Sequence, residues 1–122
     1  MTQNKKPKGL FNMKTRHYRM FVEDMLEAMD KIDRYTKGLP YEKFAQNSIL
    51  VDEVIGNLEI IGEASENIPE NVREEYPNIP WGKMIELRNV VDLGIVWEIV
   101  TKDLPETKPK IIAMLKSFSE EE

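Results

Sequence analysis

Residues 48–68 read SILVDEVIGNLEIIGEASENI and form the most regular apolar pattern in the chain. The apolar side chains recur at steps of three and four residues, which places them on one face of an α-helix. Asn47 or Ser48 can cap the start of this helix, and Asn67 to Pro69 ends it. Because the helix is apolar around more than half of its circumference, we expect it at the centre of a helical bundle. Its expected core side chains are Leu50 or Val51, Val54, Leu58, Ile61, Ala64 and Ile68.

Gly62 lies inside this helix. A glycine in a helix interior costs up to about 1 kcal/mol relative to alanine. Close packing of a second helix would explain why a glycine is used at this position. We therefore expect another helix to approach Gly62.

The segments on either side predict more helices and no strand, since no alternating apolar run bounded by turn residues occurs. A first helix from Thr15 is expected to end at Gly38, because glycine is a common C-cap. Short helices are expected at Tyr41–Ala45 and Glu70–Glu75, and another helix begins near Pro80. The expected core side chains of the first helix are Tyr18, Phe21, Val22, Met25, Met29 and Ile32.

The C-terminal third is also helical in pattern. Asp92 to Val100 is strongly apolar, and we expect Leu104-Pro105 to break that helix. The fold class is therefore all-α, an antiparallel bundle of about five helices. One helical domain, residues 15–118, is expected between a basic flexible tail, residues 1–14, and an acidic tail, residues 119–122. The last helix is expected from Pro105 to Phe118. Its expected core side chains are Ile111, Ile112, Met114, Leu115 and Phe118.

Composition narrows the class of protein. The chain has 122 residues, enough for one domain with its own core. Without cysteine it can form neither disulfides nor thiolate metal sites, which fits a cytoplasmic location. No apolar run reaches the ~20 residues of a membrane span, so we expect no membrane partner. A net charge of -5 argues against a protein that coats nucleic acid, although a local arginine can still bind one phosphate.

Two segments identify a family. LEIIGEA at residues 58–64 and IPWGKMIELRNVVDLGIVW at residues 79–97 resemble the HepT-like branch of the HEPN proteins. The resemblance extends over about residues 16–115 and implies a fold like that of nucleotidyltransferase substrate-binding subunits. It also implies a homodimer that acts as a toxin and cleaves RNA, such as tRNA, without a metal. The implied antitoxin is a minimal nucleotidyltransferase, which attaches AMP to a tyrosine of the motif.

The resemblance makes Arg88 and Asn89 the candidate catalytic residues. In the family pattern, an arginine stabilises the charge that develops on the phosphate, and a histidine removes the 2'-hydroxyl proton. Asn89 matches the polar neighbour within that motif. Taken as an isolated dipeptide, Arg88-Asn89 would more simply be an arginine paired with acidic residues and an asparagine that ends a helix.

The motif is interrupted between Val91 and Asp92, where the family has His-x-Tyr. A basic residue expected near Ile55–Asn57 is also missing, and His17, the one histidine, lies outside the motif. Three explanations are open. The interruption is a deletion that leaves an inactive subunit, or a segment is missing from the sequence, or the chain is a non-catalytic binding subunit of a nucleotidyltransferase.

No cofactor or metal is expected. One histidine without cysteine cannot supply the usual nitrogen and sulfur ligands of zinc. The carboxylates Asp52-Glu53 and Glu63 with Glu66 are explained more simply as charges on a solvated helix face. The sequence also has no phosphate-binding P-loop motif.

Overall fold

The computed structural model describes residues 8–121, and every regular element in that range is helical. The all-α prediction is therefore confirmed. A 3-10 turn, η1 (Leu87–Asn89), follows α5, and a π-helical turn, η2 (Ile99–Asp103), follows α6. The α-helices are α1 (Lys8–Thr36), α2 (Tyr41–Gln46), α3 (Ser48–Asn67), α4 (Glu70–Arg73), α5 (Trp81–Glu86), α6 (Leu93–Glu98) and α7 (Leu104–Glu121).

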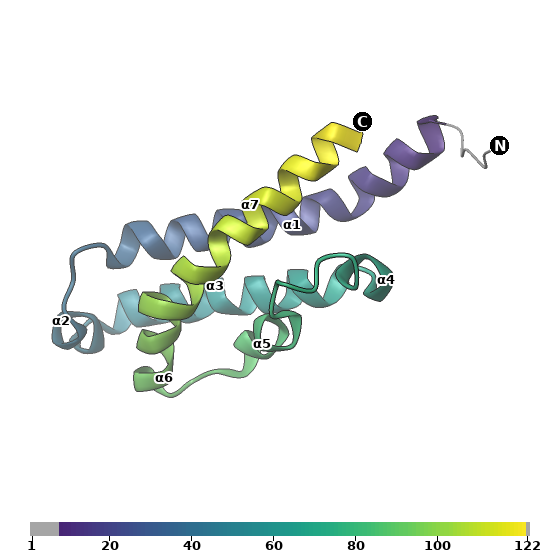
Figure 1. The fold of residues 1–122 in the computed structure, drawn as a ribbon. Coiled ribbons are helices and arrows are strands. Elements are labelled where there is room, and N and C mark those ends of the chain that lie inside the picture. Colours follow the sequence, from purple (N-terminus) through teal and green to yellow (C-terminus); the bar gives the residue numbers. More distant parts are fainter. Residues whose placement is uncertain (1–7, 122) are drawn as a thin grey trace.

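The long helices form an antiparallel bundle (Figure 1). α1 and α3 run side by side in opposite directions, with α2 at the turn between them. α7 lies along α1, while α5 and η1 pack against α3. α3 is therefore covered by α1 on one side and by α5 with η1 on the other, as expected for the central helix.

The core follows the predicted stripe of α3. Val54, Leu58, Ile61 and Ile68 are fully buried, and Ala64 is buried as well. Both ends of the helix are also as expected. The Asn47 side chain accepts a hydrogen bond from the Leu50 amide at 3.0 Å, and the Ile68 amide closes the last turn on the Ser65 carbonyl.

The first helix begins earlier than Thr15. α1 starts at Lys8, so residues 8–14 of the expected tail are helical, whereas residues 1–7 lie outside the described part of the chain. The segment from Lys8 contains two lysines and Gly9, a poor helix former, and it was therefore assigned to the basic tail. The predicted end is correct, because Gly38 has a φ of 76° just beyond Thr36. α7 likewise extends into the expected acidic tail, as far as Glu121.

The predicted break at Leu104-Pro105 is wrong. α6, η2 and α7 follow one another without a gap, and the Leu104 amide bonds to the Ile99 carbonyl across the wide π turn. Proline has no amide hydrogen to donate, and Pro105 fits within the first turn of α7 directly after this wide turn. The prediction for Ile112 is also wrong, because this residue was expected in the core and is 38% exposed. Ile111, Met114 and Phe118 are buried as predicted.

Candidate functional site

Arg88 and Asn89 lie together on η1, at the end of α5. The start of α5 is anchored by Trp81, a buried side chain whose indole N–H donates to the Tyr76 carbonyl at 3.1 Å. Met84 and Leu87 are buried farther along the same segment. These anchors fix the inward face of α5 and η1, so Arg88 is left partly buried and Asn89 exposed at the surface.

Gly62 sets the distance between η1 and α3. A Cβ atom built on Gly62 would lie 2.8 Å from the Ile85 carbonyl oxygen and 2.9 Å from both the amide nitrogen and the Cβ of Arg88. These distances are too short for any side chain at Gly62. The expected close approach is therefore confirmed, and the segment that touches Gly62 is the one that holds Arg88.

Both candidate catalytic side chains are bonded to carboxylates. Arg88 Nη1 donates to Glu66 Oε1 of α3, and Asn89 Nδ2 donates to Glu86 Oε1 at 3.4 Å. Asn89 is also the last residue of η1. These contacts are the ones expected if Arg88 simply pairs with an acidic residue and Asn89 simply ends a helix. They also leave the Arg88 guanidinium at the surface, where it can bind a phosphate.

The interrupted part of the motif is a short connection. The chain leaves η1 at Val90, whose amide bonds to the Leu87 carbonyl at 3.4 Å, and α6 begins directly after Asp92. Asp92 caps that helix, because its carboxylate accepts from the Ile95 amide at 3.0 Å. Val91, between the two, is 77% exposed.

A groove of about 490 Å³ lies beside this connection, between α5 with η1 and α6 with η2. The Lys83 ammonium and the Asp103 carboxylate, which both line the groove, approach to 3.7 Å. Ile95, which also lines the groove, is half exposed. The groove has an apolar side formed by Leu87, Val90, Ile95 and Ile99, and charged side chains from Lys83, Glu86, Glu98, Lys102, Asp103 and Glu106.

His17 lies on α1. It is exposed, and its ring meets the edge of Phe21 at a centroid distance of 6.2 Å. Eight residues farther along α1, Met25 contacts Ser65 of α3, so His17 lies about 12 Å along the helix axis from that level. Asn57, where the family pattern suggested a nearby basic residue, is buried and donates to the Glu53 carbonyl at 2.9 Å. Neither residue is bonded to Arg88.

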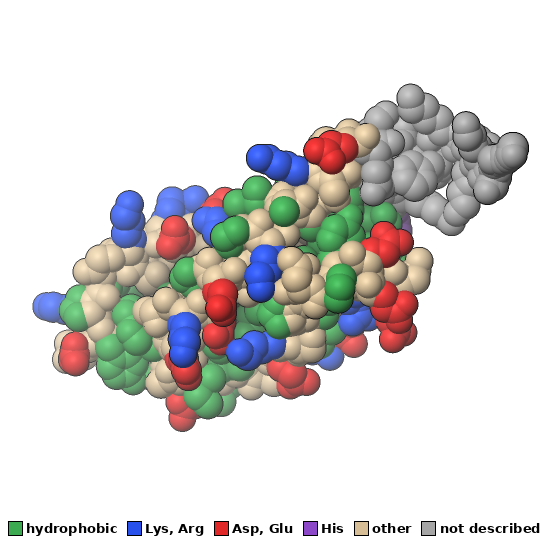
Figure 2. Space-filling model, in the orientation of Figure 1, with side chains coloured by type: hydrophobic (Ala, Val, Ile, Leu, Met, Phe, Trp, Pro, Cys, Tyr) green, Lys and Arg blue, Asp and Glu red, His purple; other side chains and the backbone are tan. Residues whose placement is uncertain are grey.

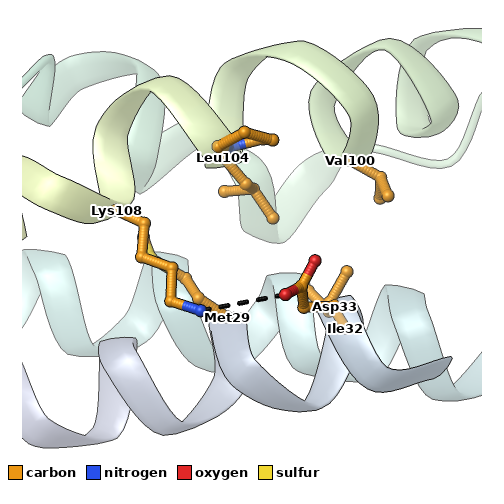
Figure 3. A pocket seen from close by; sticks show the side chains of 7 residues that line it. Met29, Ile32, Asp33, Val100, Leu104 and Lys108 are labelled. Atoms are coloured by element: carbon orange, nitrogen blue, oxygen red, sulfur yellow. Dashed lines mark ion pairs between the residues drawn. The ribbon is translucent and has the colours of Figure 1, made fainter. Parts of the chain in front are cut away.

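A second cavity, of about 190 Å³, lies between α1 and α7 (Figure 3). Met29, Ile32, Val100 and Leu104 line it, and Lys108 reaches Asp33 across its edge at 4.0 Å. None of its lining residues belongs to η1 or to the Val90–Asp92 connection. This cavity is therefore separate from the candidate site.

Acidic and basic side chains alternate on the face shown in Figure 2 and do not gather into one basic field. Within residues 17–120, no group of three or more histidine, cysteine, aspartate or glutamate side chains is placed to hold a metal ion. None of the helices that the structure describes is long and apolar enough to cross a membrane.

Glu66 was not predicted from the sequence as the partner of Arg88. The two residues are separated by 22 positions, and Glu66 falls on the face of α3 that was attributed to solvent. Charge patterning along one helix cannot show a contact with another helix. Only the Gly62 contact, which brings η1 onto α3, could have suggested that a neighbouring acid on α3 reaches Arg88.

Comparison with known proteins gives the family. A family model described as "Ribonuclease HepT-like" matches residues 25–114. A Methanocaldococcus jannaschii protein, named as a gamma-glutamylcyclotransferase and candidate RNase, is 36% identical over 107 residues, 82% of this chain and 48% of its own length. A second protein of that organism, named as a candidate RNase, is 37% identical over 81% of this chain and 97% of its own. A Thermococcus cleftensis protein, named as a probable ribonuclease HepT, is 34% identical over 83% of this chain and 98% of its own.

The chain thus spans about half the length of the first relative and nearly the whole of the other two. No solved structure matches it.

The family model matches most of the chain, including α3, α5 and η1. The relatives that are matched over nearly their whole length have names that refer to RNases. The chain belongs to the HepT-like ribonuclease family.

Proposed function

We propose that this chain is a ribonuclease-type subunit in which the RNA site is reduced to its phosphate-binding half, Arg88 with Asn89. The observation behind the proposal is the position of Arg88. It lies on η1 against Gly62, 33% exposed, and the chain then enters α6 through the short Val90–Asp92 connection. The His-x-Tyr of the family pattern is absent from this connection.

Cleavage of RNA without a metal needs two functions in one place. A fixed cation stabilises the charge that develops on the phosphate, and a base removes the 2'-hydroxyl proton. Arg88 can provide the first. An arginine side chain stays protonated in proteins and cannot provide the second. We therefore propose that the subunit binds RNA phosphate at Arg88 and cleaves RNA poorly or not at all.

The same proposal includes two protein partners. One is a second copy of the chain, and the other is a minimal nucleotidyltransferase that pairs with it as antitoxin with toxin in the cytoplasm. Support comes from the exposed apolar side chains Val91 and Ile95 beside the groove, because grouped apolar exposure usually marks an interface. If RNA plays no part, these surfaces favour the alternative function, a non-catalytic dimeric binding subunit of the nucleotidyltransferase.

The protein is expected to be a dimer at tens of micromolar. Light scattering coupled to gel filtration should give twice the 14.3 kDa mass of the chain. Replacing Val91 by Asp should shift the population toward monomer, because it places a charge in an apolar interface. Lys37→Asp, at an exposed site just after the last residue of α1, provides the control. If the parent protein is a monomer at this concentration, the proposed dimer is wrong.

The cleavage test uses purified protein, tRNA and a chelator. The parent and Arg88→Ala are expected to leave the tRNA equally intact, while both retain binding to the co-expressed nucleotidyltransferase. Loss of a general acid-base lowers the rate by about 10²–10⁴, and this is why the parent protein is expected not to cleave the tRNA. Metal-independent cleavage by the parent that is lost in Arg88→Ala would contradict the proposal. His17 or Glu66 would then be the base to test.

A further inference from the structure

Each of the two candidate catalytic side chains donates a hydrogen bond to a carboxylate. Arg88 donates to Glu66, and Asn89 donates to Glu86. The site therefore combines one positive charge with two negative charges. A phosphate approaching Arg88 must compete with the carboxylate bound at Nη1, because both anions are attracted to the same positive charge.

Resting on the phosphate-binding role given to Arg88 above, we propose that Glu66 masks Arg88. The carboxylate neutralises the guanidinium in the free protein, and an RNA phosphate binds by taking the place of Glu66. The identity of residue 66 thus sets the RNA affinity of the site.

The exposure of the pair supports a contact that can open. The side chain of Glu66 is 50% exposed and that of Arg88 is 33% exposed. Exposed ion pairs are weak and exchange with solvent ions, whereas a buried pair would be a permanent structural contact. An anion from solution can therefore reach Arg88 at little cost.

The backbone of Arg88 does not need Glu66 to hold its position. The amide and Cβ of Arg88 fill the space where a side chain on Gly62 would lie, and Leu87, the preceding residue, is 2% exposed. These contacts fix η1 on α3 whether or not the ion pair forms. Removing the charge of Glu66 should therefore free the guanidinium and leave its location unchanged.

The test measures binding of a fluorescein-labelled single-stranded dodecauridylate by anisotropy in 0.1 M salt with chelator. Glu66→Gln is expected to tighten binding about two- to fivefold, the range that follows from an exposed ion pair. Glu59→Gln is the matched control. It removes the same charge from an exposed site on α3, about 10 Å along the helix from Glu66, where salt screens most of its effect. Glu66→Ala, which also removes the hydrogen bond, should tighten binding as well.

Arg88→Ala and the double variant Glu66→Gln/Arg88→Ala complete the test. If Glu66 acts through Arg88, the double variant binds no better than Arg88→Ala. Equal tightening in Glu66→Gln and Glu59→Gln would overturn the masking role and leave Arg88 as a phosphate contact. Weaker binding in either Glu66 variant would overturn it too, since Glu66 would then position Arg88. If Arg88→Ala binds RNA as well as the parent, Arg88 does not bind phosphate, and the proposed function is wrong as well.

Discussion

Insertion of the missing motif segment between Val91 and Asp92 is expected to make this protein a metal-independent ribonuclease. The insert is a short segment that carries His-x-Tyr, the part of the family pattern that this chain lacks between these two residues. The histidine supplies the base that the parent lacks, so cleavage of tRNA should rise by about 10²–10⁴ over the parent. Gel analysis of labelled tRNA with chelator present measures the rate.

The structure favours this position for an insertion. Val91 is 77% exposed, and the two ends of the connection are stabilised independently. The Val90 amide closes η1 on Leu87, while the Asp92 side chain caps α6. An exposed loop of this length adds little entropy cost, so circular dichroism and thermal melting should show a folded protein.

Two controls separate the expected chemistry from contamination. The same insert with its histidine replaced by alanine, and the insert combined with Arg88→Ala, should both be inactive. A folded graft that leaves tRNA intact would mean that the interruption alone does not explain the loss of activity. Cleavage that survives Arg88→Ala would show that Arg88 is not part of the site.

Gly62→Ala is expected to destabilise the protein by about 1–3 kcal/mol, although alanine is the better helix former. The added Cβ would meet the Ile85 carbonyl at 2.8 Å and the Arg88 amide at 2.9 Å. These are backbone atoms, which cannot turn aside as the end of a flexible side chain can. η1 must therefore move away from α3, and Arg88 moves with it.

Gly56→Ala is the matched control, because Gly56 lies in the same helix with no atom within 4 Å of the added Cβ. It should stabilise the protein by up to about 1 kcal/mol through helix propensity alone. Thermal melts should then shift in opposite directions, by about 3–6 °C for each kcal/mol in a chain of this size. Equal shifts for the two variants would mean that η1 does not pack tightly on Gly62.

The long helices were predictable because their apolar residues keep one spacing over many turns. α3 shows this best, since five of its predicted core residues are buried and both of its ends are where the sequence places them. Gly62 was predictable for a related reason, since a glycine costs stability inside a helix unless a neighbour needs the space. Local regularity of this kind is visible in one chain without any knowledge of its contacts.

Features that depend on the backbone path or on distant partners were not predictable. Pro105 was expected to end a helix, but the preceding π turn accommodates it. The partner of Arg88 is on another helix, and no pattern along the chain connects the two residues. The start of α1 was missed for a third reason, because residues 8–14 contain Gly9, and glycine is unfavourable inside a helix.

The π turn at Ile99–Asp103 also determines how the C-terminal part of the chain is rotated. Each residue of an α-helix adds about 100° of rotation, and a wide turn contains one residue more than an α-turn. The angular register of α7 is therefore reset relative to α6. α6 directs Trp97 onto Phe44 of α2, with ring centroids 4.9 Å apart, while α7 directs Phe118 onto Tyr18 of α1 at 5.2 Å. The relative orientation of these two aromatic contacts is thus encoded in the length of a backbone turn rather than in the identity of its side chains.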